Sequence, residues 1–161
     1  MGADFFDKKR QKGYTVSIGM EKIVMYSDGG SRGNPGPAAL GVFIETLEKR
    51  YGEFLGVRTN NYAEYAAIIS GMKKVKSLLG KDRAKKAHLD CYMDSELACR
   101  QLNHEYRIKD ADIQRMFIEI WNEMLDFGKV TFTHVPRERN TIADAEANKA
   151  MDEASKQRGL L

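Results

Sequence analysis

The sequence predicts an α/β protein built on a sheet of five strands flanked by helices. Strand-like and helical segments follow one another in the order β-β-β-α-β-α-α-β-α, judged from hydrophobic periods and turn residues. A chain of 161 residues, 42% of them hydrophobic, can bury one core but is too short for two ordinary domains. We therefore expect one domain over residues 21–156, an N-terminal extension at 1–20 and a short C-terminal tail at 157–161.

The strands are expected where short apolar runs are bounded by turn residues. The second and third are joined by a short polar turn, which suggests an antiparallel meander. The first and fourth each end on an acidic residue, Asp28 and Asp94, and a Gly-rich turn follows the first. The five predicted strands span residues 23–28, 38–45, 50–57, 89–94 and 130–135.

The first helix is expected over residues 63–79, where Asn60 or Asn61 can cap its start and Gly80 ends it. Its apolar side chains recur at helical spacing, at Ile68, Met72, Val75 and Leu79.

Three further helices are expected over residues 95–102, 110–127 and 142–155. The last is rich in alanine, and its small residues form a stripe along one face, at Ala143, Ala147, Ala150 and Ala154.

Composition narrows the class of protein without identifying it. A net charge of +3, from 26 basic and 23 acidic residues, does not by itself indicate a polyanion-binding protein. The apolar runs are shorter than a membrane span and the N-terminus lacks the apolar core of a signal peptide, so we expect a cytoplasmic protein with no membrane partner. The two cysteines, Cys91 and Cys99, predict buried reduced thiols rather than a disulfide. We expect a monomer.

Four acidic residues in four separate segments are the strongest chemical signal. Asp28 and Asp94 end two strands, while Glu64 and Asp144 are expected in the first turns of two helices. If the two strands are parallel neighbours, their carboxylates meet at the edge where open α/β sheets usually place ligands. A carboxylate cluster needs cations, and two Mg²⁺ ions about 4 Å apart can activate water and stabilise a leaving oxygen in phosphoryl transfer. The acids therefore predict a metal-dependent nuclease.

Four motifs in order resemble those of type 1 ribonuclease H. They are Asp-Gly-Gly-Ser-Arg-Gly-Asn-Pro-Gly-Pro at 28–37, Thr-Asn-Asn-Tyr-Ala-Glu at 59–64, Asp-Ser at 94–95 and His-Val-Pro-Arg-Glu-Arg-Asn-Thr-Ile-Ala-Asp at 134–144. The resemblance extends over about residues 22–153 and implies the ribonuclease H-like fold, a five-stranded mixed sheet flanked by helices. It also implies cleavage of the RNA strand of RNA/DNA hybrids to 5′-phosphate and 3′-hydroxyl products.

The resemblance assigns roles to the four acids. Asp28 is expected to bridge two metal ions, and Asp94 and Asp144 to complete one ion each. Glu64 is expected to ligate one ion and contact a 2′-hydroxyl, the group that distinguishes RNA from DNA. The expected cofactor is Mg²⁺, with Mn²⁺ as a substitute.

The resemblance also implies a set of substrate contacts. Thr59 resembles a residue that holds a phosphate of the DNA strand, and the others resemble contacts in the minor groove and to the RNA. For Asn34 and Asn61, turn formation and helix capping are open alternatives. The expected substrate-binding residues are Gly29, Gly30, Asn34, Thr59, Asn60 and Asn61.

His134 resembles the family's loop histidine, ten residues before Asp144. Its polar loop favours a proton-transfer role, and the alternative is a structural polar side chain at a strand end.

One departure from the family pattern concerns substrate binding. Residues 103–109 lack the Lys- and Trp-rich protrusion of some members, so Lys73, Lys74, Arg107, Lys109 or the basic segment at 8–12 would have to replace it. Two other functions remain open, a DNA-acting nuclease of the same fold, of integrase or resolvase type, and a hybrid-binding module without catalysis.

Overall fold

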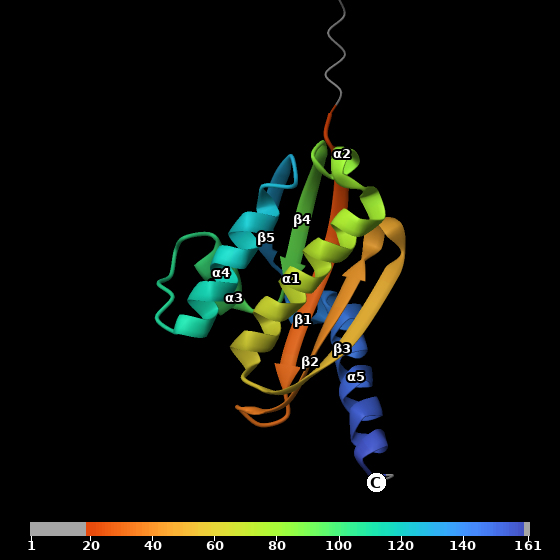
Figure 1. The fold of residues 1–161 in the computed structure, drawn as a ribbon, viewed down its shortest axis with the longest axis vertical. Helices are drawn as coiled ribbons and strands as arrows, with labels where there is room; N and C mark the ends of the chain where they lie inside the picture. Colours follow the sequence, from red (N-terminus) through yellow and green to blue (C-terminus); the bar gives the residue numbers. More distant parts are fainter. Residues whose placement is uncertain (1–18, 160–161) are drawn as a thin grey trace, which may run out of the picture.

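A computed structural model describes residues 19–159, and a five-stranded sheet forms its centre (Figure 1). The strand order is β3-β2-β1-β4-β5. The pairs β1–β2 and β2–β3 are antiparallel, and β1–β4 and β4–β5 are parallel. This is the mixed α/β sheet that the sequence predicts. The strands are β1 (Glu21–Ser31), β2 (Gly36–Ile44), β3 (Lys49–Arg58), β4 (Ala87–Met93) and β5 (Lys129–His134).

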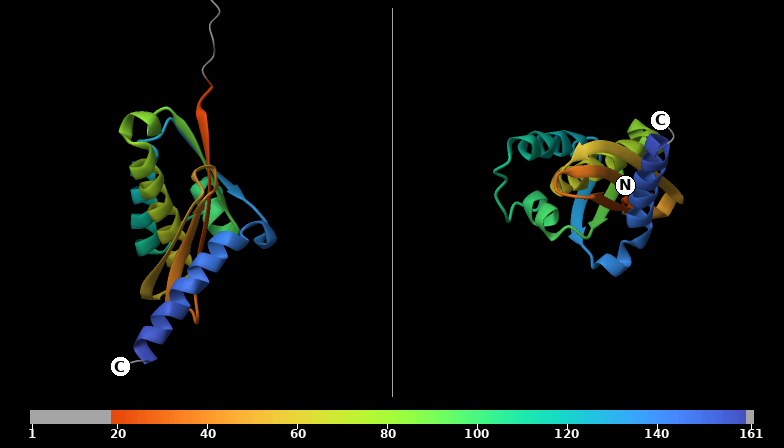
Figure 2. Two further views of the ribbon diagram at one scale, coloured as in Figure 1. Left: turned by 90° about the vertical axis from the view of Figure 1, so that its right-hand side faces the viewer. Right: turned by 90° about the horizontal axis from the view of Figure 1, so that it is seen from below.

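The helices lie on both faces of the sheet. Figure 2 shows α1 and α4 on one face and α5 crossing the other. A one-turn helix, α2, was not predicted, because four residues are too few to show a helical period. The helices are α1 (Asn60–Leu79), α2 (Lys81–Ala84), α3 (Glu96–Leu102), α4 (Ala111–Met124) and α5 (Thr141–Gly159), with 3₁₀ turns η1 (Glu45–Leu47) and η2 (Arg137–Arg139).

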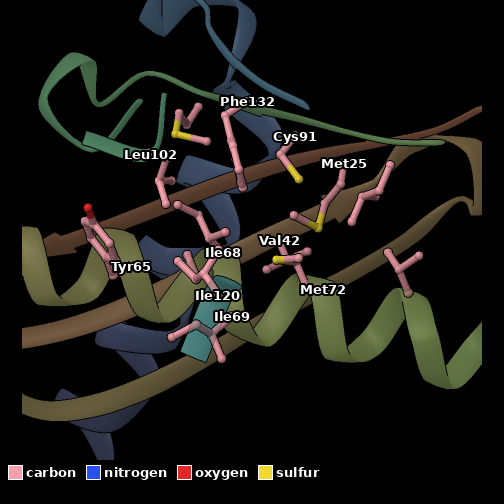
Figure 3. Close-up of a cluster of buried hydrophobic side chains, with 14 of the residues drawn as sticks. Met25, Val42, Tyr65, Ile68, Ile69, Met72, Cys91, Leu102, Ile120 and Phe132 are labelled. Atoms are coloured by element: carbon pink, nitrogen blue, oxygen red, sulfur yellow. The ribbon is translucent and has the colours of Figure 1, made fainter. Parts of the chain in front are cut away.

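The main core lies between the sheet and α1. Ile68 and Met72 of α1 pack with Met25, Val42 and Cys91 from three neighbouring strands, and all five are fully buried (Figure 3). The expected apolar face of α1 is therefore confirmed. Cys91 and Cys99 are both free and buried, as expected.

On the opposite face α5 lies directly on the backbone of β2. A Cβ at Gly41 would collide with the carbonyl oxygen of Ala143 and lie 2.7 Å from the backbone nitrogen of Ala147. Ala143 and Ala147 are buried, so the alanine stripe is the surface through which α5 docks. Large side chains on this stripe would lift the helix from the sheet.

Three local predictions were wrong. The first strand does not end at Asp28, because β2 continues to pair with β1 as far as Ser31. The cap of α1 is Thr59, whose hydroxyl accepts from the backbone N–H of Tyr62, and not Asn60 or Asn61. Because α1 therefore begins earlier than expected, Glu64 lies in its second turn and not its first.

The outer parts of the chain are described only in part. Helix α5 continues to Gly159, into the segment expected to form the tail. The N-terminal extension falls almost entirely on residues 1–18, outside the described residues. Within 19–159, no helix combines the length and the apolarity that crossing a membrane requires.

Candidate active site

The four acidic residues converge on one cleft of about 670 Å³. Asp28 comes from β1, Asp94 follows β4, Glu64 comes from α1 and Asp144 from α5. Carboxylate oxygens of Asp28, Glu64 and Asp94 lie within 4.8 Å of one another. The structure thus brings together side chains that are up to 116 positions apart, the separation of residues 28 and 144.

The parallel pairing of β1 with β4 explains why two of the acids meet. The register pairs Ser27 with Met93, so the next residues along the two strands are Asp28 and Asp94. Their carboxylates therefore project from adjacent strands at one edge of the sheet, the usual ligand position in this class of fold.

Glu64 reaches the strand because glycine allows a close approach. A Cβ at Gly29 would collide with the backbone of Ala63 and Glu64. With glycine there, the backbone N–H of Gly29 donates to Oε2 of Glu64 at 3.3 Å. The second glycine, Gly30, has open space beside it, so only the first is required by packing.

Asp144 is held by two asparagines. Asn140, buried at the start of α5, donates from Nδ2 to the carbonyl oxygen of Ser27 at 2.9 Å, which ties the helix start to β1. Asn148, one turn further along, donates from Nδ2 to the carbonyl oxygen and to Oδ1 of Asp144 at 3.1 and 3.2 Å. The helix therefore presents its carboxylate in a fixed direction.

The carboxylates repel one another at this spacing. Burial, followed by the negative charges of Asp94 and Asp144, raises the pKa of Asp28 to about 8. Burial and the charges of Asp28 and Asp94 also raise the pKa of Glu64 well above its usual range, against weaker opposing effects of the Gly29 N–H and Arg137. Cations would relieve this repulsion, and an all-carboxylate oxygen donor set fits hard divalent ions such as Mg²⁺.

The expected substrate-binding residues fall into two groups. Gly29, Gly30, Asn34, Asn60 and Asn61 line the acidic cleft. Asn34 accepts from the backbone N–H of Asn60 at 3.1 Å, and Asn60 accepts from the backbone N–H of Ser31 at 2.8 Å. These two side chains fasten the β1–β2 turn to the start of α1.

Asn61 differs from these two. Its Oδ1 atom is buried without a hydrogen-bond partner in the described part of the chain. A buried polar atom of this kind at the wall of a cleft is free to accept a hydrogen bond from a ligand or water.

Thr59 lies outside the acidic cleft. It lines a neighbouring cleft of about 440 Å³ together with Arg58 and Tyr62. Its hydroxyl already accepts the capping hydrogen bond of α1. A phosphate at this point would meet the N-terminus of the helix, which favours anions.

His134 is exposed at the end of β5 and pairs in register with Met93, beside Asp94. It is not among the residues that line the acidic cleft, whereas Arg137 is, with Nε 3.7 Å from Oδ2 of Asp94.

Sequence reasoning assigned no role at the site to Arg32, Arg137 or Asn148, all of which line the cleft. Asn148 could have been found from its spacing, because it lies four residues after Asp144 and so on the same helical face. Arg32 and Arg137 each lie within a quoted motif, but nothing in the sequence distinguishes them from surface arginines.

Comparisons with known proteins agree with this geometry. A family model described as reverse transcriptase-like matches residues 26–150. Ribonuclease HI of Halobacterium salinarum is 34% identical over 137 residues, which cover 83% of this chain and 66% of that protein. The bifunctional protein Rv2228c of Mycobacterium tuberculosis is 34% identical over 139 residues, 83% of this chain but 36% of that protein. The chain thus spans about a third to two thirds of these relatives.

Solved structures show the same similarity. LC11-RNase H1 in complex with an RNA/DNA hybrid superposes with a TM-score of 0.77 at 35% identity, covering 82% of this chain and 98% of that one. RNase H1 of Halobacterium salinarum NRC-1 gives a TM-score of 0.73 at 34% identity, with coverage of 82% and 98%.

The strand order and the helices on both faces define a ribonuclease H-like fold. Together with the matches over most of the chain, they place this protein in the type 1 ribonuclease H family.

Proposed function

We propose that the protein is a metal-dependent endonuclease that hydrolyses the RNA strand of RNA/DNA hybrids to 5′-phosphate and 3′-hydroxyl products. The observation that carries the proposal is the cluster of buried Asp28 with half-buried Glu64 and Asp94, whose oxygens lie within 4.8 Å of one another in the cleft. The hybrid bound to the related LC11-RNase H1 supports the choice of substrate.

The carboxylates fit a two-metal site. Asp28, central to the cluster, would contact both ions, Asp94 and Asp144 would hold one each, and Glu64 would ligate one. Bound Mg²⁺, or Mn²⁺ in its place, supplies a water of lowered pKa and charge stabilisation for the leaving oxygen. The chain itself fixes the carboxylates in position, through the Gly29 N–H on Glu64 and Asn148 on Asp144.

Selectivity for RNA requires groups that contact the 2′-hydroxyl. Glu64 and the free Oδ1 atom of Asn61 both lie in the cleft wall. Both can accept a hydrogen bond from a 2′-hydroxyl. These acceptors favour the hybrid over a DNA duplex, and therefore favour ribonuclease H activity over an integrase or resolvase activity of the same fold.

The decisive experiment compares cleavage of a labelled RNA/DNA hybrid with that of matched DNA and RNA duplexes in Mg²⁺. We expect cleavage of the RNA strand of the hybrid alone. Asp28→Asn and Asp94→Asn should each lower the rate at least about 100-fold, because each removes a metal ligand. Asp82→Asn, an exposed acid on α2, is the matched control. If either cleft variant cleaves the hybrid as fast as the wild type, the metal site is refuted. If the wild type binds the hybrid but does not cleave it, a binding module is favoured.

A further inference from the structure

The cleft carries more negative than positive side chains, although its proposed substrate, a nucleic acid duplex, is itself negatively charged. Among residues 19–159, its lining side chains include the four carboxylates and two cations, Arg32 and Arg137. Metal ions can offset the acids at the centre, but a nucleic acid duplex also needs cations along its flanking phosphates. Since Arg137 faces Asp94, Arg32 is the cation of the lining that has no partner among the four acids.

We propose that Arg32 binds a backbone phosphate of the hybrid, and that Asp152 on α5 holds and competes for its guanidinium when no substrate is bound. The proposal rests on the proposed function, because it names a substrate contact of the same cleft. Arg32 donates from Nη2 to Oδ1 of Asp152 at 2.7 Å. Asp152 does not itself line the cleft.

The backbone that carries Arg32 is already held in place. The N–H of Arg32 donates to the carbonyl oxygen of Pro37 at 2.8 Å. The neighbouring Ser31 N–H donates to Oδ1 of Asn60 at 2.8 Å. Only the side chain has to reorient to exchange one anion for another, so little backbone ordering opposes phosphate binding.

The contact with Asp152 is easily displaced. The two side chains are 45% and 57% exposed, and exposed ion pairs of this kind contribute little to stability. Only Nη2 of the guanidinium is engaged among the described residues. The remaining N–H groups can still make the bidentate contacts with a phosphate for which arginine is suited.

A purely structural role makes the opposite prediction for Asp152. If the pair served only to tie the β1–β2 turn to α5, removing either partner would loosen the cleft and weaken substrate binding. If Asp152 competes with phosphate, removing its charge should release Arg32 and strengthen binding. The effect of removing the charge of Asp152 on hybrid binding therefore separates the two explanations.

The test is the equilibrium binding of a short fluorescently labelled RNA/DNA hybrid by the full chain, in EDTA so that no cleavage occurs, over a series of salt concentrations. Arg32→Ala should raise Kd about fivefold and lower the slope of log Kd against log salt by about one unit. Arg32→Lys should restore the slope. Asp152→Asn should lower Kd by about twofold to fivefold.

Matched controls isolate the effect of position from that of charge. Glu153→Gln removes the same charge from the next position of α5, and Arg83→Ala removes a cation from α2, where its partner is Glu21. Both should leave Kd within about twofold of wild type. An unchanged slope in Arg32→Ala, or weaker binding by Asp152→Asn, would overturn the assignment. A wild type that binds in this way but does not cleave in Mg²⁺ would refute the proposed catalysis and leave the Arg32 contact intact.

Discussion

At the scale of single residues, the pKa of Asp28 is strongly affected by its surroundings. The residue is 8% exposed, and its carboxyl lies near two other acids. Because its pKa is raised from 3.8 to about 8, the metal-free folded protein binds a proton that the unfolded chain releases over this range. Its contribution to stability is present below about pH 4 and is lost as pH rises through about pH 8.

Asp28→Asn should therefore stabilise the metal-free protein at high pH while abolishing cleavage. Between about pH 5 and about pH 8 the wild type should lose stability relative to the variant, by at least about 1 kcal/mol. Thermal unfolding in EDTA at a series of pH values measures this difference. Saturating Mg²⁺ should remove it in the wild type, because the ions stabilise the ionised carboxylates. If the melting temperatures of the wild type and the variant depend on pH in the same way in EDTA, the pKa of Asp28 is not raised in the folded protein.

The roles of His134 and Arg137 can be separated kinetically. We expect His134→Ala to lower kcat about 100-fold with little change in KM, because a proton-transfer group acts in the transition state. His134 is exposed, so the melting temperature should barely change. Arg137→Ala, which removes a cleft-lining cation beside Asp94, is the comparison, and it should alter KM as well. If His134→Ala keeps its kcat, the proton-transfer role is wrong.

At the scale of elements, the position of α5 controls the position of Asp144. The helix carries this acid in its first turn and rests on β2 through the backbone at Gly41. A displacement of the helix by the width of a methyl group would move the carboxylate away from the other three.

Gly41→Ala should therefore impair both the fold and the catalysis. The added Cβ would meet backbone atoms of Ala143 and Ala147, which cannot move without the helix. We expect a loss of about 2 to 4 kcal/mol of unfolding free energy and a drop in cleavage rate. Gly30→Ala, where the same methyl group meets open space, is the control for unfolding. Chemical denaturation of both variants provides the comparison, and equal stabilities would mean that α5 does not rest on the strand as described.

At the scale of the whole molecule, two of the lysines on α1 form ion pairs with acids on or just after α4. Lys73 pairs with Glu119 at 2.7 Å, and Lys76 pairs with Glu123 and Asp126 at 2.7 and 2.8 Å. Lys76, bound to two acids and less exposed, is a poor candidate for binding the hybrid, whereas the exposed Lys73 pair contributes little to stability and leaves Lys73 a candidate for replacing the missing protrusion. Lys74 lies over the ring of Tyr51, 4.2 Å from its centroid.

Hybrid binding should accordingly depend on salt and on the basic N-terminal segment. Deleting residues 2–15, which include Lys8, Lys9 and Arg10, should raise Kd for the hybrid and reduce the salt slope by roughly 0.9 for each phosphate that the shortened chain no longer binds. Binding titrations of the full and shortened chains at several salt concentrations provide the measurement. A control deletion of residues 160–161 should have no effect. Identical slopes for the full and the 2–15-deleted chains would make the segment a solvated extension.

The sequence by itself determined the fold class, the order of the five strands and the four longer helices, and the four acids that line the cleft. These features depend on local signals, namely hydrophobic period, turn residues and short motifs, which act over a few neighbouring positions. The expected strand end at Asp28 failed because it depends on a partner strand. The expected cap of α1 failed because three successive residues, Thr59, Asn60 and Asn61, are all of types that can cap a helix. The pairing of β2 with the end of β1 extends the strand, and the hydroxyl of Thr59 begins the helix.

Only the tertiary structure decided how the site is assembled. The register of β1 against β4 places Asp28 beside Asp94, and the absence of a Cβ at Gly29 lets Glu64 approach. The contact of Arg32 with Asp152 joins positions 120 apart, which no local pattern reports. Local residue preferences specify the elements, but distances between side chains remote in sequence are set by strand register and close packing.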